Sequence, residues 1–268
     1  LTEQSIGRLF MAGILPGLLL MVLFIATIAI VSALDPAAGP RGPLVPLREK
    51  LAKLGQSMPL IGVIVVSIGG IYAGAFTAVE ASAVGAGLVI ILGFAARRID
   101  LAGFGRAVMD TVKTSAMLYM IVIGANVLNP FLAVTHIPET LGNGLVGMGL
   151  GPYGTLAMII LAYVVLGMFL DGLAMLVVTI PIVFPVIQQV GFDPIWFGVV
   201  AVIVIEMGMI TPPVGLNVFV VKGVARDVPI TTIFRGVAPF LLAMFVGLLL
   251  IIMFPQIALL IPNSMYGS

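Results

Sequence analysis

Two polar segments interrupt the apolar sequence between residues 167 and 217, and their residue types suit the binding of a cation. Residues 167–172 read GMFLDG, and residues 210–217 read ITPPVGLN. The two adjacent prolines have no N–H, so carbonyl groups before them lose their helical hydrogen-bond partners. Such carbonyls, together with the hydroxyl of Thr211, are hard oxygen ligands of the kind that coordinates Na⁺ in broken transporter helices. We therefore expect a Na⁺ site at these two segments.

The polar residues of the two segments also have purely structural interpretations. Asp171 could be a ligand for a cation or a substrate, or it could cap the helix that begins at Gly172, and the two roles are compatible. Residues 210–217 could form a simple proline kink, with Asn217 bonded to a neighbouring helix. Two consecutive prolines exceed what a kink needs, so we favour a binding loop. Glu206 could be a buried carboxylate that tunes the site, or it could bond to a neighbouring helix.

The helices that position these segments belong to a polytopic membrane protein. Of the 268 residues, 61% are hydrophobic and 9% are charged, whereas soluble domains carry about 25% charged residues. Apolar runs such as 233–261 exceed the roughly 20 residues that span the hydrocarbon core of a bilayer. The net charge of +1 gives no indication of nucleic-acid binding. The chain has no cysteine and one histidine, His136, so we expect neither a metal cluster of these residues nor an enzyme active site.

The first polar segment divides a stretch, 154–190, that is too long for one membrane span. Each arm would have about 17 residues, at the short limit for crossing a bilayer. A re-entrant helical hairpin with its tip at Asp171 and Gly172 explains this length better than two full spans. The second polar segment breaks the next helix, 194–222, which has Asp193 as its expected N-cap and Pro194 in its first turn.

The remaining spans are predicted from apolar runs of sufficient length. They comprise residues 6–33, 58–76, 78–96, 114–133 and 232–261. Pro16 and Gly17 would kink the first of them. Residues 72–77 form a tight break, after which Thr77 and Glu80 are spaced as a capping box.

The basic residues predict which loops face the cytoplasm. All but Arg8 lie in residues 41–53, 97–113 and 222–235, which the expected spans place on one side. Positive loops face the cytoplasm, so the opposite side, with the C-terminus, is expected to be periplasmic. Within these loops, residues 44–54 could form a short interfacial helix, and 97–113 resemble an amphipathic surface helix. Counting 154–190 as two full spans gives the same sidedness, so the charges do not decide between a hairpin and two spans.

The motifs resemble those of one known family. Residues 167–175 (GMFLDGLAM), 179–185 (TIPIVFP), 191–194 (GFDP) and 210–217 are similar to the large membrane subunit of tripartite ATP-independent periplasmic (TRAP) transporters. The opening, 5–17 (SIGRLFMAGILPG), resembles the start of the second half of that subunit, so the resemblance covers essentially the whole chain. Residues 77–80 (TAVE) depart from the usual Thr-Pro-Thr-Glu run of the family, so the break there could be softer, although Glu80 is retained.

The resemblance implies a protein of the bacterial inner membrane that imports organic acids, such as dicarboxylates and sialic acids, by Na⁺ symport. In that family a periplasmic substrate-binding protein delivers the substrate, and a small membrane (Q) subunit supports the large (M) subunit. The large subunit resembles elevator-type transporters with two inverted repeats, each holding a re-entrant hairpin and a broken helix. The chain shows one such pair and begins at Leu1 rather than methionine. We therefore expect the C-terminal half of a large subunit, with the N-terminal half as its partner.

The resemblance also implies roles for particular residues. Na⁺ ligands are expected at Gly167, Asp171, Ile210, Thr211, Pro212 and Gly215. Substrate contacts are expected at Asp171, Gly172, Thr211, Pro213 and Asn217, facing the missing half. The expected divisions are a first span and basic loop (1–57), scaffold-type spans (58–133), an external connecting arm (134–153), a transport core (154–225) and a final span (226–268). The core would slide vertically against the other spans.

Two other classes of protein remain as alternatives. The first is a Na⁺ or H⁺ carboxylate symporter of similar architecture that needs no binding protein. The second is a membrane enzyme or an assembly scaffold. An enzyme needs a nucleophile–base pair or a metal cluster, which the sequence does not indicate, and a scaffold does not explain two neighbouring polar breaks. We therefore expect a transporter and not an enzyme.

Overall fold

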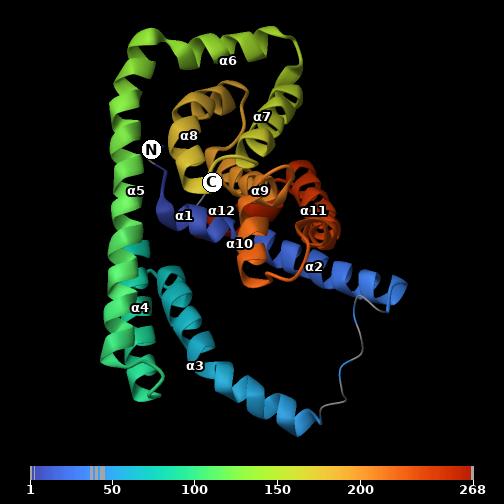
Figure 1. Cartoon of the computed structure of the whole chain (residues 1–268). Helices are drawn as coiled ribbons and strands as arrows, with labels where there is room; N and C mark the ends of the chain where they lie inside the picture. Colours follow the sequence, from blue (N-terminus) through green and yellow to red (C-terminus); the bar gives the residue numbers. More distant parts are fainter. Residues whose placement is uncertain (1, 3, 37–38, 40–41, 43–45, 267–268) are drawn as a thin grey trace. The chain divides into compact units, whose positions relative to one another are not determined.

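The computed structural model describes residues 2, 4–36, 39, 42 and 46–266, and every regular element among them is an α-helix. The chain divides into two compact units, residues 1–39 with 118–268 and residues 40–117, which are described separately. The first unit contains α1 (Ile6–Ala12), α2 (Ile14–Leu34), α6 (Ile137–Gly147), α7 (Gly151–Gly167), α8 (Gly172–Gln189), α9 (Pro194–Ile210), α10 (Leu216–Val224), α11 (Ile230–Met253) and α12 (Gln256–Tyr266) (Figure 1). The second unit contains α3 (Leu47–Tyr72) and α4 (Ala78–Ala95), and α5 (Leu101–Thr135) begins in the second unit and ends in the first.

Several of these helices are long and apolar enough to cross a membrane. Five such stretches occur in the described residues: Ile6–Leu34, Ala78–Ala95, Leu101–Leu132, Gly172–Gln189 and Ile230–Met253. Shorter apolar helices are Ser57–Tyr72, Gly151–Gly167 and Pro194–Ile210. These helices confirm the prediction of an all-α, multi-pass membrane protein, because about 20 apolar residues suffice to span a bilayer.

Helix α9 forms the core of the first unit. Trp196, Val200 and Val204 are almost fully buried, and α7, α8 and α11 all contact the helix. The indole Nε1 of Trp196 donates a hydrogen bond of 3.0 Å to the carbonyl of Ile251 on α11, and its ring stacks on that of Phe192, with centroids 5.1 Å apart. These contacts cover most of α9, whereas Val202 and Glu206 are exposed on it. The helix that carries the second polar segment is therefore held firmly in place.

In the second unit, α3 and α4 are joined at the predicted break. Gly74 has a φ of 69°, which glycine adopts without strain. The backbone N–H of Thr77 donates to Glu80 Oε2 at 2.8 Å, and the N–H of Glu80 donates to Thr77 Oγ1 at 3.3 Å. These reciprocal bonds are the predicted capping box, which sets the first residue of α4.

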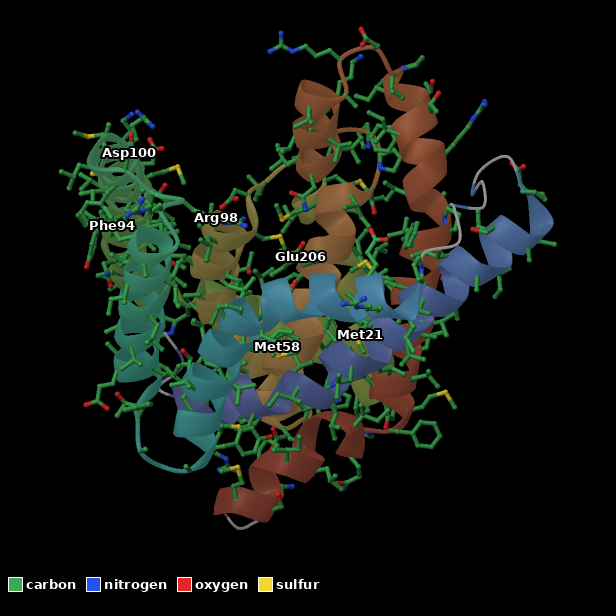
Figure 2. All side chains as sticks on the ribbon, turned by 90° about the horizontal axis from the view of Figure 1, so that it is seen from below. Met21, Met58, Phe94, Arg98, Asp100 and Glu206 are labelled. Carbon is green, nitrogen blue, oxygen red and sulfur yellow. The ribbon has the colours of Figure 1, made fainter. Side chains whose placement is uncertain are left out.

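The junction between α4 and α5 leads into a longer helix than predicted. The rings of Phe94 and Phe104 lie 5.7 Å apart, and Asp100 Oδ1 accepts a hydrogen bond of 2.7 Å from the N–H of Gly103 (Figure 2). From there α5 continues without interruption to Thr135, so the predicted surface helix and the fourth span are one helix. Polar residues indicate where a helix leaves the lipid, but they do not by themselves end the helix.

Prolines explain two further differences from the predicted helices. The first span is interrupted at Gly13, between α1 and α2, and not at Pro16. Pro16 has no N–H to donate to the carbonyl of Ala12, four residues earlier, so the interruption comes about one turn before it. The predicted last span is divided between α11 and α12, because the residue before Pro255 is pushed out of the helical region. That residue, Phe254, has φ −126° and ψ 75°.

Two connections contain more helix than the sequence suggested. Helix α3 begins at Leu47, so residues 47–54 are the first part of a long helix and not a separate interfacial one. Arg41 and residues 43–45 of this loop lie outside the described residues. The arm 134–153 contains α6, which follows His136 with a φ of 50°.

Candidate functional site

The turn between α7 and α8 forms the tip of a helical hairpin. The carbonyl of Leu166 accepts hydrogen bonds from the N–H groups of Phe169 and Leu170, at 3.0 and 2.9 Å, which closes α7. Asp171 then accepts hydrogen bonds from the N–H groups of Leu173 and Ala174, at 3.1 and 3.4 Å. Asp171 is therefore the N-cap of α8, as predicted, and its side chain is exposed.

The two arms of this hairpin are held together at mid-length. The hydroxyls of Tyr163 on α7 and Thr179 on α8 are hydrogen-bonded at 2.9 Å and buried. At the far end, a Cβ placed on Gly142 of α6 would lie 3.1 Å from Val186 Cγ2, so α8 returns to the helix that precedes α7 (Figure 1). The structure thus contains the helical hairpin, and its depth in a membrane remains a prediction.

The second segment breaks the helix between α9 and α10, at the residues predicted. Thr211 leaves the helical region, with φ −88° and ψ 137°. Its N–H donates to the carbonyl of Gly208 at 3.0 Å, and its hydroxyl donates to the carbonyl of Met207. The peptide bond between Pro212 and Pro213 is cis. Because Pro213 has no N–H, it offers no helical hydrogen bond to the carbonyl four residues earlier.

Gly215 returns the chain into α10. It has φ 62° and ψ 73°, in the left-handed region that glycine tolerates. A Cβ there would lie 3.1 Å from Phe234 Cε1 and 3.2 Å from the carbonyl oxygen of Thr211. That carbonyl therefore lies close to Gly215. No side chain caps α10, which begins at Leu216.

A close contact between two glycines brings the hairpin tip to the break. A Cβ placed on Gly208 of α9 would lie 2.8 Å from the Cα of Gly167 and 3.0 Å from the carbonyl oxygen of Val164. A Cβ on Gly172 would lie 2.9 Å from Ile205 Cγ2 and 3.2 Å from Met209 Sδ. The backbones of α7 and α9 touch at the ends where both helices stop, because neither glycine has a side chain to separate them.

This contact joins some of the predicted residues and not others. Gly167 and Gly172 lie against the last turn of α9, which ends at Ile210 and Thr211. Asn217 is half-buried in the first turn of α10, and its side chain makes no hydrogen bond within the described residues. The sequence analysis did not identify Gly208. Its only signal was that a small residue lies one turn before the break.

Glu206 does not take either of the roles that the sequence suggested. Its side chain is exposed on α9 (Figure 2). Within the described residues it has neither a hydrogen bond nor an ion pair. The interpretation as a buried carboxylate is therefore wrong. Glu206 follows the exposed Val202 by four residues, so both lie on the same face of α9. The rest of this unit does not cover that face.

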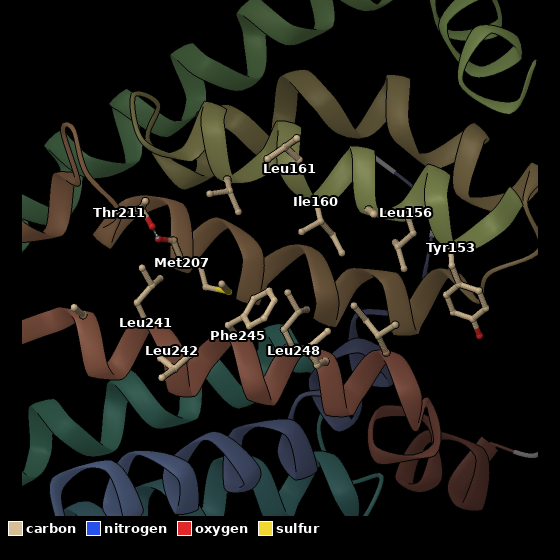
Figure 3. A pocket seen from close by; sticks show the side chains of 15 residues that line it. Tyr153, Leu156, Ile160, Leu161, Met207, Thr211, Leu241, Leu242, Phe245 and Leu248 are labelled. Carbon is tan, nitrogen blue, oxygen red and sulfur yellow. Dashed lines mark hydrogen bonds between the residues drawn. The ribbon is translucent and has the colours of Figure 1, made fainter. Parts of the chain in front are cut away.

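An apolar groove of about 740 Å³ lies beside the break, lined by α7, α9 and α11 (Figure 3). Thr211 lies at one end of the groove and Tyr153 at the other, with Met207 and Leu248 among the buried residues that line it. The lining is almost wholly hydrocarbon, so the groove does not supply the polar groups that an organic acid needs.

The family of this chain is shown by comparison with known proteins. Residues 1–257 match the family model described as the tripartite ATP-independent periplasmic transporter, DctM component. The chain belongs to this family. The resemblance of residues 167–217 to TRAP large subunits is thereby confirmed.

Individual members of the family are similar over nearly the whole of this chain. A C4-dicarboxylate TRAP transporter large permease protein of Pseudomonas aeruginosa is 34% identical, with 98% of this chain and 61% of the relative covered. A sialic acid TRAP transporter large permease protein of Vibrio cholerae is 34% identical, with 99% of this chain and 62% of the relative covered. An ectoine TRAP transporter large permease protein of Halomonas elongata is 29% identical, with 97% of this chain and 60% of the relative covered. The chain thus spans about three fifths of the length of these relatives.

Proposed function

We propose that this chain is the C-terminal half of a TRAP transporter large subunit and forms half of a Na⁺-coupled import site for an organic acid. The observation that carries the proposal is the contact of Gly167 with Gly208. It joins the tip of a helical hairpin to the break in the next helix. Two such irregular backbone segments are tolerated at membrane depth only where they are buried in protein or line a cavity.

The oxygen atoms of the break suit Na⁺. The hydroxyl of Thr211 donates its hydrogen to the carbonyl of Met207, which leaves its oxygen lone pairs available to a cation. The carbonyl of Thr211 lies close to Gly215. Pro212 and Pro213, which follow Thr211, have no N–H groups to donate to nearby carbonyls. The C-terminal ends of α7 and α9 also carry the negative ends of their helix dipoles. We assign the Na⁺ ligands to the hydroxyl of Thr211 and to backbone carbonyls at Gly167, Ile210, Thr211, Pro212 and Gly215. Asp171 adds negative charge nearby.

The start of α10 suits the carboxylate of a substrate. It has no side-chain cap. Within the described residues no hydrogen bond engages the N–H groups of Leu216 and Asn217, so these two can bind an anion at the positive end of the helix dipole. Asn217 lies in this first turn, and its amide has no hydrogen-bond partner among the residues that the structure describes. The names of the relatives include C4-dicarboxylate, sialic acid and ectoine. The family alone therefore does not fix the substrate, and the geometry favours an organic acid.

The rest of the transport system is part of the same proposal. The missing half of the large subunit would face the tip and the break and complete the substrate site. A small membrane subunit and a periplasmic binding protein would complete the transporter in the bacterial inner membrane. Movement of α7 to α10 as a body across the bilayer would expose the site to each side in turn.

The test is uptake of labelled organic acids into proteoliposomes that hold the full-length large subunit and its small subunit. Na⁺ and the binding protein are varied independently, for the wild type and for Thr211→Ala and Asp171→Asn. Uptake that requires both additions and is weakened by both substitutions supports the proposal. Uptake without binding protein indicates a simple symporter instead, and full activity of both variants contradicts the proposed site.

A further inference from the structure

A basic residue lies one helical turn beyond one end of the apolar groove between α7 and α11. On α11, Ala238, Leu242, Phe245 and Ile252 line the groove and repeat at the three- and four-residue spacing of one helix face. Arg235 precedes Ala238 by three residues and therefore lies on the same face, one turn beyond the end of the groove. Its side chain is exposed, and within the described residues no hydrogen bond or ion pair engages it.

The other charged groups near this end are already engaged or lie off that face. Lys222 donates its ammonium group to the carbonyls of Arg226 and Val228, and Arg226 Nε donates to the carbonyl of Gly223 at 3.4 Å. Asp227 is the one acidic residue of the connection between α10 and α11. The opposite end, at Tyr153, has no basic residue near it in sequence, since residues 114–221 contain neither lysine nor arginine. The groove thus joins a long hydrocarbon surface to a positive charge at one end only.

We propose that this groove binds an anionic phospholipid, with the phosphate at Arg235 and an acyl chain along α11 toward Tyr153. Basic pockets between membrane helices on the cytoplasmic side bind anionic head groups, and the basic loops of this chain are expected on that side. From Ala238 to Ile252 the groove extends about 21 Å along α11, compared with about 15 Å of hydrocarbon in one leaflet. The whole acyl chain therefore fits along it.

The size of the groove favours an acyl chain over a helix of another protein. A helix with its side chains is about 10–12 Å across, so 21 Å of helix fills more than about 1,600 Å³. The groove holds about 740 Å³. Only a few side chains of a helix could enter it, whereas a single acyl chain can lie within it along its length.

The occupant would contact the back of the proposed Na⁺ site. Thr211 and Met207 both line the groove, and the hydroxyl of the first donates to the carbonyl of the second. Hydrocarbon against these residues excludes water from that side of the break. On the proposed function, anionic lipid then stabilises the conformation of the break that binds Na⁺.

The test measures lipid binding apart from transport. The thermal unfolding midpoint of the purified full-length transporter is followed in detergent, with added phosphatidylglycerol or phosphatidylcholine of identical acyl chains. Phosphatidylglycerol is expected to raise the midpoint more. Arg235→Gln should raise its half-saturating concentration about fivefold, and Ala238→Phe should block the groove and also weaken the response. Arg226→Gln also removes one positive charge, but from a residue that is not on the groove face of α11. It should leave the response unchanged.

Three results would overturn the inference. The first is an equal response to the two lipids, and the second is an equal loss in Arg235→Gln and Arg226→Gln. The third is a polypeptide, rather than a lipid, attached to a photo-crosslinking benzoylphenylalanine at Leu242 in native membranes. Since neither readout needs transport, a failure here is distinct from a failure of the proposed Na⁺ coupling.

Discussion

At the scale of single residues, the two polar segments depend on groups that serve local structure and remain free for a ligand. Asp171 caps α8 through Leu173 and Ala174. A carboxylate retains acceptor capacity beyond these bonds, so capping does not prevent a second role. Thr211 uses its hydrogen on the carbonyl of Met207 and keeps its lone pairs. The structural and functional interpretations of both residues are therefore compatible.

Substitution of Asp171 separates its cap from its charge. Asparagine caps helices as well as aspartate, whereas alanine costs about 1 kcal/mol. We predict that Asp171→Asn retains the unfolding midpoint and lowers Na⁺-dependent uptake, and that Asp171→Ala lowers both. Thermal unfolding in detergent and uptake in proteoliposomes measure the two effects. If Asp171→Asn transports as the wild type does, the carboxylate acts only as a cap.

Gly208 should tolerate no side chain. A Cβ there would lie 2.8 Å from a backbone atom of Gly167, which cannot move without separating α7 from α9. Overpacking of this kind costs about 1–3 kcal/mol, so Gly208→Ala is predicted to lower the unfolding midpoint and uptake. The matched control is Gly236→Ala on α11, where a Cβ meets nothing within 4 Å. Equal effects of the two substitutions would show that the glycine contact is not what joins the tip to the break.

At the scale of elements, the hairpin and the broken helix form one packed group around α9. Trp196 fixes the start of α9 against α11 through the carbonyl of Ile251, and the glycine contact fixes its end against α7. The hydroxyl pair of Tyr163 and Thr179 joins the two arms of the hairpin between these points. If this group moves as a body in the proposed transport cycle, α11 must move with it or the bond of Trp196 to Ile251 must break.

The hydroxyl pair allows the coupling of the two arms to be measured. Removing the hydroxyl of Thr179 leaves that of Tyr163 buried without this partner, whereas Thr179 keeps its bond to the carbonyl of Met175 when Tyr163 is replaced. A double-mutant cycle of Tyr163→Phe and Thr179→Val should therefore give a coupling energy of about 0.6 kcal/mol, the typical value between membrane helices. Chemical unfolding in detergent provides the free energies. A coupling energy of zero would mean that the bond does not hold the arms together.

The sequence was sufficient to predict the elements that have local signals. The caps at Asp193, Thr77 and Asp171 and the break after Ile210 were all predictable, because proline and capping side chains act within one turn. The division of the first span at Gly13 and the unbroken length of α5 were not, because apolar content does not mark where a helix ends. In the site, Gly208 could not be foreseen. Its role depends on a partner, Gly167, that is far away in sequence.

At the scale of the whole molecule, we expect the basic connections on the cytoplasmic side. Residues 222–235, from the end of α10 to the start of α11, include Lys222, Arg226 and Arg235, and the arm that contains α6 has no lysine or arginine. If the hairpin is counted as re-entrant, an odd number of membrane crossings separates these basic residues from the arm that contains α6. This count is consistent with the positive residues lying on the cytoplasmic side. The two ends of the first unit should therefore be accessible from opposite sides.

Single cysteines can test this sidedness, since the chain has none of its own. Val224 and Met148 are 87% and 61% exposed, and each is replaced by cysteine in turn. A membrane-impermeant maleimide added to intact cells with permeable outer membranes should label Met148→Cys. It should label Val224→Cys only after the inner membrane is opened. Labelling of both from outside would contradict the proposed orientation.

The most direct test of the central claim is the Na⁺ dependence of uptake in Thr211→Val. Valine keeps the volume of threonine but removes the oxygen assigned to Na⁺. Thr27→Val is the matched control, because the Thr27 hydroxyl also donates to a carbonyl four residues earlier, at 2.8 Å, but on α2, away from the break. Loss of one ligand should raise the Na⁺ concentration for half-maximal uptake about tenfold, with no change in Thr27→Val. An unchanged Na⁺ dependence in Thr211→Val, with uptake intact, would contradict the claim that the break binds Na⁺.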